Sequence, residues 1–354
     1  MAIIPAQEET LISLHGTRNI ILDDLIDKAT DIRDSFNRHR VNGNAARPIY
    51  MNDNKELFVA CQDQYTGGYT LVSDVSNHAF GQACDYIGVP AQYMKKCYER
   101  GLDDLVSINI DRQLQAKAGL PDGLNYFSNL IALESEGVCE AFVTNKYNFG
   151  FQTPEVLETI KEYMPETYLP NQAYLSKQRL HIRFIDFDHP EYVGGEKMSV
   201  GFTVGTSDIG KSALQVRFFL YKFACQNGIV SGSRGGILYK QKHIGDTFDT
   251  DNIMAFRECF NNIELLREEG LELIRASQNR LMSENEMAAI LDTCRKYACN
   301  IGETEKTLII ALANERYGHT KWGLINGITE VAQNHTLDTR LAYESWAGRL
   351  LQSA

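Results

Sequence analysis

The spacing of apolar residues changes along this chain, and that change limits the fold more than any other feature. Between residues 174 and 222 apolar and polar residues alternate, whereas from Asp251 onward apolar residues recur every three or four positions. Alternation is typical of a strand with one buried face, and the longer period is typical of an amphipathic helix. The pattern therefore predicts an α+β protein with an antiparallel β-sheet core in the middle of the chain and a helical C-terminal third.

Three alternating stretches define the predicted sheet: 179–184, 198–204 and 214–221, with a β-hairpin turn at Gly194-Gly195. Their apolar members point to one side and predict a buried face. The opposite side carries cations and aromatic residues, namely Arg179, His181, Arg183, Arg217, Phe219 and Tyr221. We expect one buried face and one basic-aromatic face.

The rest of the chain is organised less clearly. Helical spacing predicts helices at 20–40, 75–86, 91–99, 153–163, 251–280, 284–299, 303–315, 320–334 and 337–352. Shorter runs predict strands at 57–61, 69–72, 104–118 and 129–145. Thr153, followed by Pro154, is expected to cap its helix. The predicted regions are 1–170 (mixed α/β), 171–250 (sheet and basic loop) and 251–354 (helical), and the last two could form one domain.

Charge is unevenly distributed. The 354 residues carry a net charge of −11, yet residues 174–243 hold ten lysines and arginines against five acidic residues. A basic segment in an acidic protein could bind a polyanion. It could equally pair with acidic helices elsewhere in the fold or in a neighbouring subunit. Charge alone leaves both interpretations open.

One segment fits a catalytic motif. The run from Gly205 through Gly210 and Lys211 to Ser212 matches G-x-x-x-x-G-K-[ST], the phosphate-binding P-loop. A P-loop needs a helix immediately afterwards, but residues 213–222 alternate and favour a strand. A glycine-bounded hairpin turn is the alternative interpretation, and the nucleotide-binding one stays open.

No other catalytic or metal site is predicted, and no cofactor. The histidines show no H-E-x-x-H spacing, and no G-x-S-x-G elbow occurs. A local metal cluster of His181 and His189 with Asp186 and Asp188 is weighed against an ordinary acidic turn between strands. The eight cysteines contain no C-x-x-C pair and are expected to be reduced and mostly buried.

The strongest candidate site is the basic-aromatic face together with the loop that follows it. That loop adds Arg234, Lys240 and Lys242. Cations neutralise phosphates and aromatic rings stack on unpaired bases, so this combination suits single-stranded DNA. A solvated sheet face or a subunit interface is the alternative.

Several segments together resemble a known family. They are Tyr69–Asp74, Ala83–Pro90 with Tyr93, Ala141–Tyr147 with Thr153–Leu157, Val204–Gly210, Phe219–Val230 and Thr320–Glu330. They are similar to phage- and plasmid-like bacterial proteins described only as a domain of unknown function, over about residues 65–350. The resemblance implies a mobile-element origin and a Ser-acid-x-Gly turn at 207–210 in which Lys211 is not required. It implies no catalytic residues.

These observations lead to one hypothesis and two alternatives. We expect a mobile-element protein of DNA metabolism that binds single-stranded DNA, forms homo-oligomers and could promote strand annealing during recombination. One alternative is a phage inhibitor that binds a host protein through its acidic surface; the other is an enzyme that binds nucleotide at Gly205–Ser212. No membrane span or signal peptide is evident, so a cytoplasmic location is expected.

Overall fold

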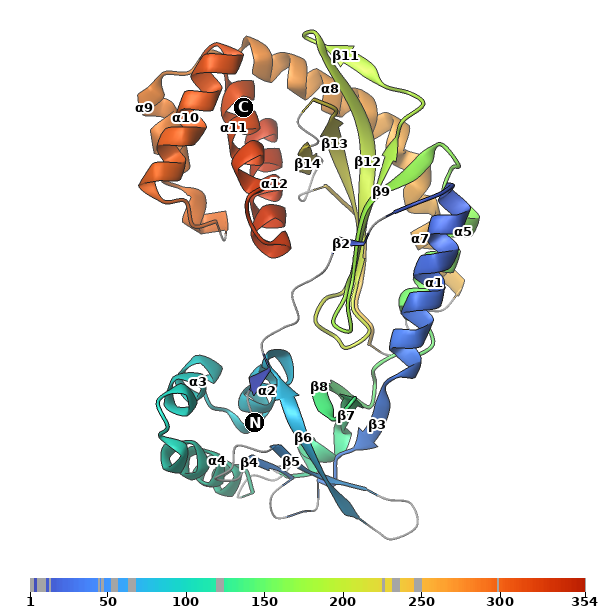
Figure 1. The fold of residues 1–354 in the computed structure, drawn as a ribbon, viewed down its shortest axis with the longest axis vertical. Coiled ribbons are helices and arrows are strands. Elements are labelled where there is room, and N and C mark those ends of the chain that lie inside the picture. Colours follow the sequence, from blue (N-terminus) through green and yellow to red (C-terminus); the bar gives the residue numbers. More distant parts are fainter. Residues whose placement is uncertain are drawn as a thin grey trace.

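The computed structural model contains two sheets, each with its own hydrophobic core (Figure 1). It describes residues 3–4, 11–12, 14–43, 45, 48–51, 57–62, 68–118, 124–224, 227–230, 236–244, 250–297 and 299–353. The larger sheet is antiparallel and lies mostly in the middle of the chain, and the C-terminal third is helical. The predicted α+β class is therefore confirmed.

The larger sheet is built around a long hairpin. Its strands, in spatial order, are β14 (Asn227–Val230), β13 (Leu214–Lys222), β12 (Glu196–Thr206), β10 (Leu180–Asp186), β9 (Tyr168–Leu175) and β2 (Leu11–Ile12). β11 (Glu191–Val193) pairs with β12, and β15 (Ile237–Gln241) pairs with β13. Gly194 and Gly195 form the β11–β12 turn with φ of 59° and 83°, a conformation that favours glycine. The hairpin prediction is confirmed.

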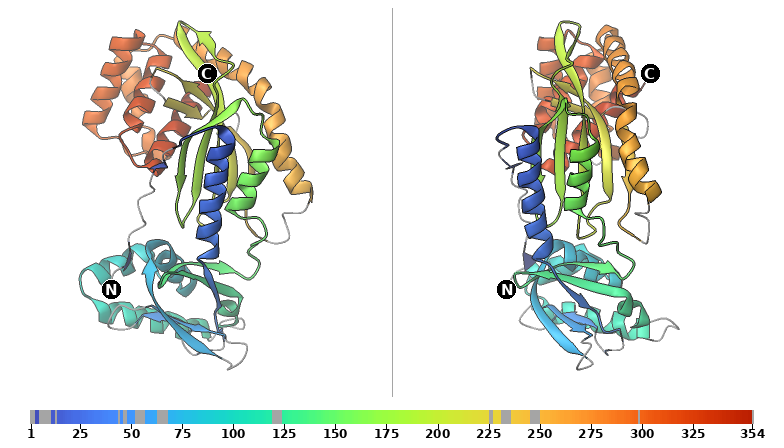
Figure 2. Two further views of the ribbon diagram at one scale, coloured as in Figure 1. Left: turned by 45° about the vertical axis from the view of Figure 1, so that its right-hand side comes forward. Right: turned by 90° about the vertical axis from the view of Figure 1, so that its right-hand side faces the viewer.

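Helices cover both faces of the larger sheet (Figures 1 and 2). On the apolar face lie α1 (Arg18–Asp34), α5 (Thr153–Tyr163), α7 (Thr250–Glu258), η2 (Cys259–Asn262) and α8 (Ile263–Asn279). Beyond the other face lie α9 (Glu284–Leu291), η3 (Cys294–Tyr297), α10 (Glu303–Tyr317), α11 (Lys321–Ala332) and α12 (Leu337–Gln352). The ring of Phe202 in β12 lies 5.1 Å from that of Phe260 in η2, so aromatic packing ties the first set to the sheet.

The smaller sheet is mixed. Its strands run β3 (Asn37–Arg40), β7 (Leu130–Ser135), β8 (Val138–Thr144), β6 (Tyr69–Ser76), β5 (Leu57–Cys61) and β4 (Ile49–Met51), with β1 (Ile3–Ile4) beside β6. β6 pairs in parallel with both β8 and β1. The accompanying helices are α2 (Asn77–Ile87), α3 (Ala91–Glu99), α4 (Asp103–Ala118) and η1 (Leu124–Asn129). Residues 1–170 thus contribute to both cores, because α1 and α5 pack on the larger sheet.

Three local predictions are wrong. Residues 104–118 form helix α4 rather than strands, because Val106, Ile110 and Leu114 are buried at a spacing of four. The helix predicted over 20–40 ends at Asp34, and 37–40 pairs with β7 instead. The N-cap of α5 is Gln152, since the hydroxyl of Thr153 donates to a distant carboxylate.

The turn between β12 and β13 joins the two sheets. Ile209 at its tip is fully buried against Leu133, Ala141 and Val143 of the smaller sheet. The hydroxyl of Tyr147, which follows β8, donates to the carbonyl of Ser207 at 2.9 Å. The tip of the larger sheet is therefore inserted into the smaller one.

Two further properties concern the described part of the chain as a whole. Its cysteines are all free and buried, as predicted, and burial raises the pKa of the Cys84 and Cys259 thiols to about 12. Cys225 lies outside the described residues. Across the described helices, none is both long and apolar enough to cross a bilayer.

Candidate functional site

The face predicted to be basic and aromatic is largely covered by helix α12 (Figure 1). Arg183, in the middle of β10, is 2% exposed and forms an ion pair with Glu344, which is itself 1% exposed. Glu344 also accepts a hydrogen bond at 3.0 Å from Arg340, one turn earlier in α12. Because both oxygens of Glu344 are engaged inside the protein, Arg183 is a structural cation and is removed from the predicted nucleic-acid contacts.

The aromatic members of that face are also buried. Phe219 and Tyr221 in β13 pack with Ile185 in a small cluster of their own, 1% and 4% exposed. The guanidinium of Arg183 lies 5.6 Å from the centre of the Phe219 ring. The prediction that these rings stack on bases is wrong, since no base can reach them in this fold. Alternating polar residues along a strand predict a sheet face that is exposed to solvent, but in this protein the chain's own helices cover that face.

Part of the face nearer the β12–β13 turn remains open. A pocket of about 290 Å³ lies between this part and the first turns of α12. Its lining includes Arg179, His181, Thr203, Gln215, Arg217 and Ser345. We call this space the arginine pocket. It brings together three of the predicted nucleic-acid contacts, Arg179, His181 and Arg217, with Gly205 and Ser212 of the P-loop match. Thr203, Gln215 and Ser345 were not predicted, because nothing in their spacing marks them.

The two arginines of the pocket differ in their partners. Arg179 pairs with Asp338 at 2.5 Å. Arg217 donates to the side-chain oxygen of Gln215 at 2.7 Å and to the hydroxyl of Ser345 at 3.3 Å, and it has no carboxylate partner among the described residues. Burial lowers the pKa of the Arg217 guanidinium from its ordinary value, with Arg349 acting in the same direction. The pocket therefore holds a partly desolvated cation without a counter-charge.

His181 is the third cationic candidate, but it is held neutral. The side chain is 6% exposed, and its Nε2 has no hydrogen-bond partner among the described residues. Burial, followed by the neighbouring charges of Arg183 and Arg179, lowers the pKa of the His181 imidazole well below its ordinary value. His181 thus contributes polarity to the pocket and no charge at neutral pH.

A second hollow, of about 490 Å³, lies where the turn of the larger sheet meets the smaller sheet. Its lining includes Tyr86, Tyr147, Lys211, Lys240, Lys242 and His243. We call it the lysine hollow. Lys240 and Lys242 are exposed, and Tyr86 is half-buried. Arg234, the remaining predicted contact, lies outside the described residues.

The two spaces adjoin. Ser212, Ala213 and Gln215 line both the arginine pocket and the lysine hollow, so the two spaces meet beside the β12–β13 turn, at the start of β13. We call the two spaces together the basic groove. The groove extends from the first turns of α12, through Asp338 and Ser345, to Tyr86 of α2 and Val143 of β8 in the smaller sheet.

The segment that matches the P-loop is a hairpin turn. Strand β13 begins at Leu214, so the helix that a P-loop requires is not formed. Asp208 accepts hydrogen bonds at 2.8 Å from the backbone and hydroxyl of Thr153, and Lys211 donates to the side chain of Gln178 at 2.6 Å. Gly210 adopts a φ of 76°. The Ser-acid-x-Gly segment therefore makes structural hydrogen bonds at the junction of the two sheets. It does not form the phosphate-binding loop that a P-loop motif requires.

The histidine–aspartate cluster considered as a metal site is an ion-pair network. Asp186 accepts from Arg267 at 2.6 Å and lies 3.0 Å from the ring nitrogen of His189, while His181 lies elsewhere on the strand. Within the described ranges, no group of three or more potential metal-ligating residues is gathered.

Buried His243 makes the junction sensitive to acid. Its Nε2 lies 2.9 Å from the hydroxyl of Thr206, its ring stacks on Tyr147, and burial lowers the pKa of His243 to about 4. An unfolded histidine has a pKa of about 6.5, so between pH 6.5 and 4 the unfolded state binds a proton that the folded state rejects. This group's contribution to stability is complete above about pH 6.5 and is lost as the pH falls.

His243→Gln is accordingly expected to reduce acid sensitivity. The amide can keep a hydrogen bond to Thr206 but cannot titrate. The free energy of unfolding is measured by urea denaturation at pH 7 and at pH 4.5. Its decrease between these two pH values should be about 2–3 kcal/mol smaller in the variant than in the unsubstituted protein. His15→Gln, at an exposed position before α1, is the control and should behave like the unsubstituted protein. An identical acid loss in His243→Gln would contradict the assignment.

Comparisons of this chain with family models, with curated proteins and with solved structures found no match. The resemblance to the phage- and plasmid-like family therefore stays a prediction.

Proposed function

We propose that this protein binds single-stranded nucleic acid, with the lysine hollow holding the backbone. The observation that supports this most directly is the grouping of Lys211, Lys240 and Lys242 around one hollow that also contains the Tyr86 ring. Lysines neutralise phosphates, and an aromatic ring beside them offers a surface on which a base can stack.

The size of the hollow favours a single strand over a duplex. A space of about 490 Å³ is typical of pockets for small molecules. It can accept an unpaired base and its phosphate, whereas the bases of a duplex are already stacked and paired. Only unpaired bases can leave the stack without a cost of a few kcal/mol each.

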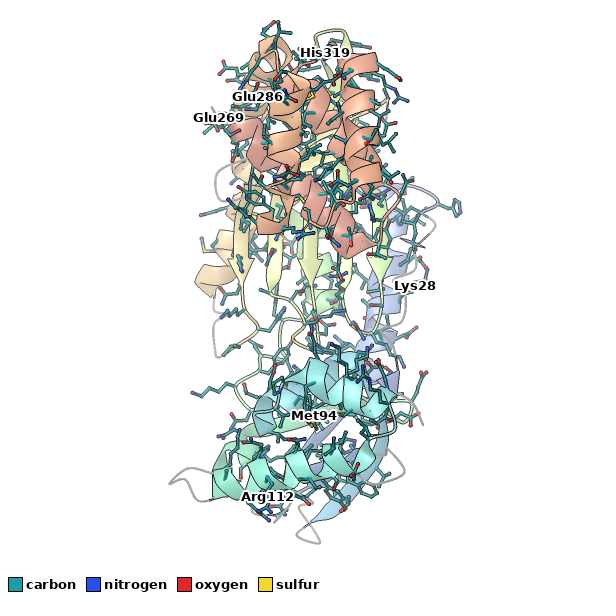
Figure 3. The ribbon with its side chains drawn as sticks, turned by 90° about the vertical axis from the view of Figure 1, so that its left-hand side faces the viewer. Lys28, Met94, Arg112, Glu269, Glu286 and His319 are labelled. Carbon is teal, nitrogen blue, oxygen red and sulfur yellow. The ribbon has the colours of Figure 1, made fainter. Side chains whose placement is uncertain are left out.

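The net charge of −11 does not oppose this proposal, because acidic residues are concentrated elsewhere. Glu268, Glu269 and Glu272 are exposed on α8, at the far end of the larger sheet from the lysine hollow (Figure 3 labels Glu269). At physiological salt, screening limits the interaction between charges in water to a distance of about 8 Å. The electrostatic potential in the groove is therefore set mainly by the lysines that line it.

The test is fluorescence anisotropy of a labelled single-stranded oligonucleotide at low and moderate salt, with a duplex as the comparison. We expect salt-dependent binding that prefers the single strand. The double variant Lys240→Ala/Lys242→Ala should weaken binding and reduce the salt slope by about 0.7 for each phosphate that the protein no longer neutralises.

A matched control removes two lysines from the other side of the sheet. Lys28→Ala/Lys161→Ala changes the net charge equally, on α1 and α5, where each lysine forms an exposed ion pair worth little to stability. It should leave the affinity and the slope unchanged. Absence of binding at low salt, or equal weakening by both double variants, would overturn the proposal.

Self-association and strand annealing are further predictions, to be measured by light scattering and by an annealing assay once binding is seen.

A further inference from the structure

The arginine pocket is the closed end of the basic groove. Along β10, Arg179 and His181 line the pocket, while Arg183, two residues further on, is fully enclosed with Glu344. Beyond that ion pair the sheet face is filled by the cluster containing Phe219. A strand that entered from the lysine hollow could therefore not continue past Arg183.

Positive charge exceeds negative charge around this closed end. Four guanidinium groups act on His181, those of Arg179, Arg183, Arg217 and Arg340. Glu344 is shared by Arg183 and Arg340, and Asp338 pairs with Arg179, so four guanidinium groups lie near two carboxylates and Arg217 has no carboxylate partner among the described residues. Buried charges are normally paired, because removing an unpaired charge from water costs several kcal/mol. The arrangement is typical of a site completed by an anion.

The donors around the pocket suit one kind of anion. Arg217 offers a planar fork of N–H groups, which matches the oxygens of a phosphate or carboxylate. Thr203, Ser212 and Ser345 add hydroxyl groups, and the Nε2 of His181 has no partner among the described residues. A tetrahedral group with several oxygens can use these donors at the same time.

We propose that the arginine pocket binds the terminal phosphate of a nucleic-acid strand whose backbone lies in the lysine hollow. A terminal phosphate carries nearly two negative charges at neutral pH, against one for an internal phosphodiester, and so matches the excess of two positive charges that four guanidinium groups and two carboxylates leave around the pocket. This inference rests on the proposed function, but the anion pocket can be tested separately with inorganic phosphate.

The first experiment measures the thermal unfolding midpoint with inorganic phosphate, at an ionic strength held constant with sodium chloride. Phosphate should raise the midpoint of the unsubstituted protein, because a ligand that binds only the folded state stabilises it. Arg217→Gln should lose this shift, whereas Arg217→Lys, which keeps the charge, should retain part of it. Arg112→Gln, at an exposed position on α4 (Figure 3), is the control and should keep the full shift.

The second experiment compares oligonucleotides of one sequence that end in a 5′-phosphate, a 3′-phosphate or hydroxyl groups only. We expect one phosphate-ended form to bind about tenfold more tightly than the hydroxyl form, and Arg217→Gln to abolish that preference. Lys240→Ala/Lys242→Ala should weaken all three forms and keep their ratio.

The outcomes separate the two proposals. Lysine-dependent binding with no preference for a terminal phosphate, or equal weakening of all three forms by Arg217→Gln, would overturn the terminal-phosphate site and leave the lysine hollow as proposed. A phosphate shift that needs Arg217, without any oligonucleotide binding, would support the anion pocket and overturn the nucleic-acid function. No phosphate shift and no end preference would overturn this inference entirely.

Discussion

Glu344→Ala is expected to lower the free energy of unfolding by about 3–5 kcal/mol. The substitution leaves the guanidinium of Arg183 enclosed without a counter-charge and removes an acceptor from Arg340. Breaking one side of a buried ion pair costs more than the pair itself contributes, because the remaining charge keeps its desolvation penalty. Urea denaturation followed by circular dichroism measures the loss.

Two further variants separate charge from packing. Glu330→Ala removes a glutamate from α11 that pairs with Arg316 in an exposed bridge, and it should cost less than about 1 kcal/mol. Arg183→Met combined with Glu344→Leu removes the enclosed pair and should recover part of the stability that Glu344→Ala forfeits; Arg340, which is 6% exposed, still lacks its carboxylate partner in this variant. A loss in Glu344→Ala no larger than that in Glu330→Ala would show that α12 is not held to the sheet by this ion pair.

Gly201→Ala is expected to destabilise the protein by about 3 kcal/mol. A Cβ built at Gly201 lies 2.2 Å from the carbonyl oxygen of Phe184 in the neighbouring strand and 2.8 Å from the ring of Phe219. The contact with Phe184 is to backbone, so neither strand can give way without disturbing the β10–β12 ladder. The ring of Phe219 occupies the space that a side chain at 201 would need.

Gly205→Ala is the matched control on the same strand and the same face. Its Cβ would approach no atom closer than 3.8 Å, an ordinary van der Waals contact. We expect a change within about 0.5 kcal/mol. Equal losses at the two positions, measured in the same denaturation experiment, would show that strand propensity and not the close approach of Phe219 requires glycine at 201.

The local patterns of this chain were sufficient for most of its secondary structure. The alternation from Leu180 to Lys222 and the helical spacing after Asp251 depend only on which side of an element is apolar, and both were confirmed. Residues 104–118 were misread because short apolar runs fit either period until a partner surface is known. Residues 37–40 form a strand only because β7 supplies its hydrogen bonds.

The candidate site was predicted less well, and for a physical reason. Arg179, Arg183 and Arg217 stand on one face of the sheet, as their alternation requires, but their chemical roles depend on the opposing helix. A polar side chain looks the same in a sequence whether it faces water or a carboxylate. The sequence left open the possibility that the basic segment pairs with acidic helices. In the structure, two of these arginines do so: Arg179 pairs with Asp338 and Arg183 with Glu344, both on α12.

The sequence by itself determined the α+β class, the hairpin at Gly194-Gly195 and the excess of positive charge in the middle of the chain. These follow from residue spacing and composition, which are local properties. Only the tertiary structure decided which cations are enclosed and which line the basic groove. Burial and charge pairing depend on contacts between residues more than a hundred positions apart, such as Arg183 with Glu344, and no local pattern encodes those contacts.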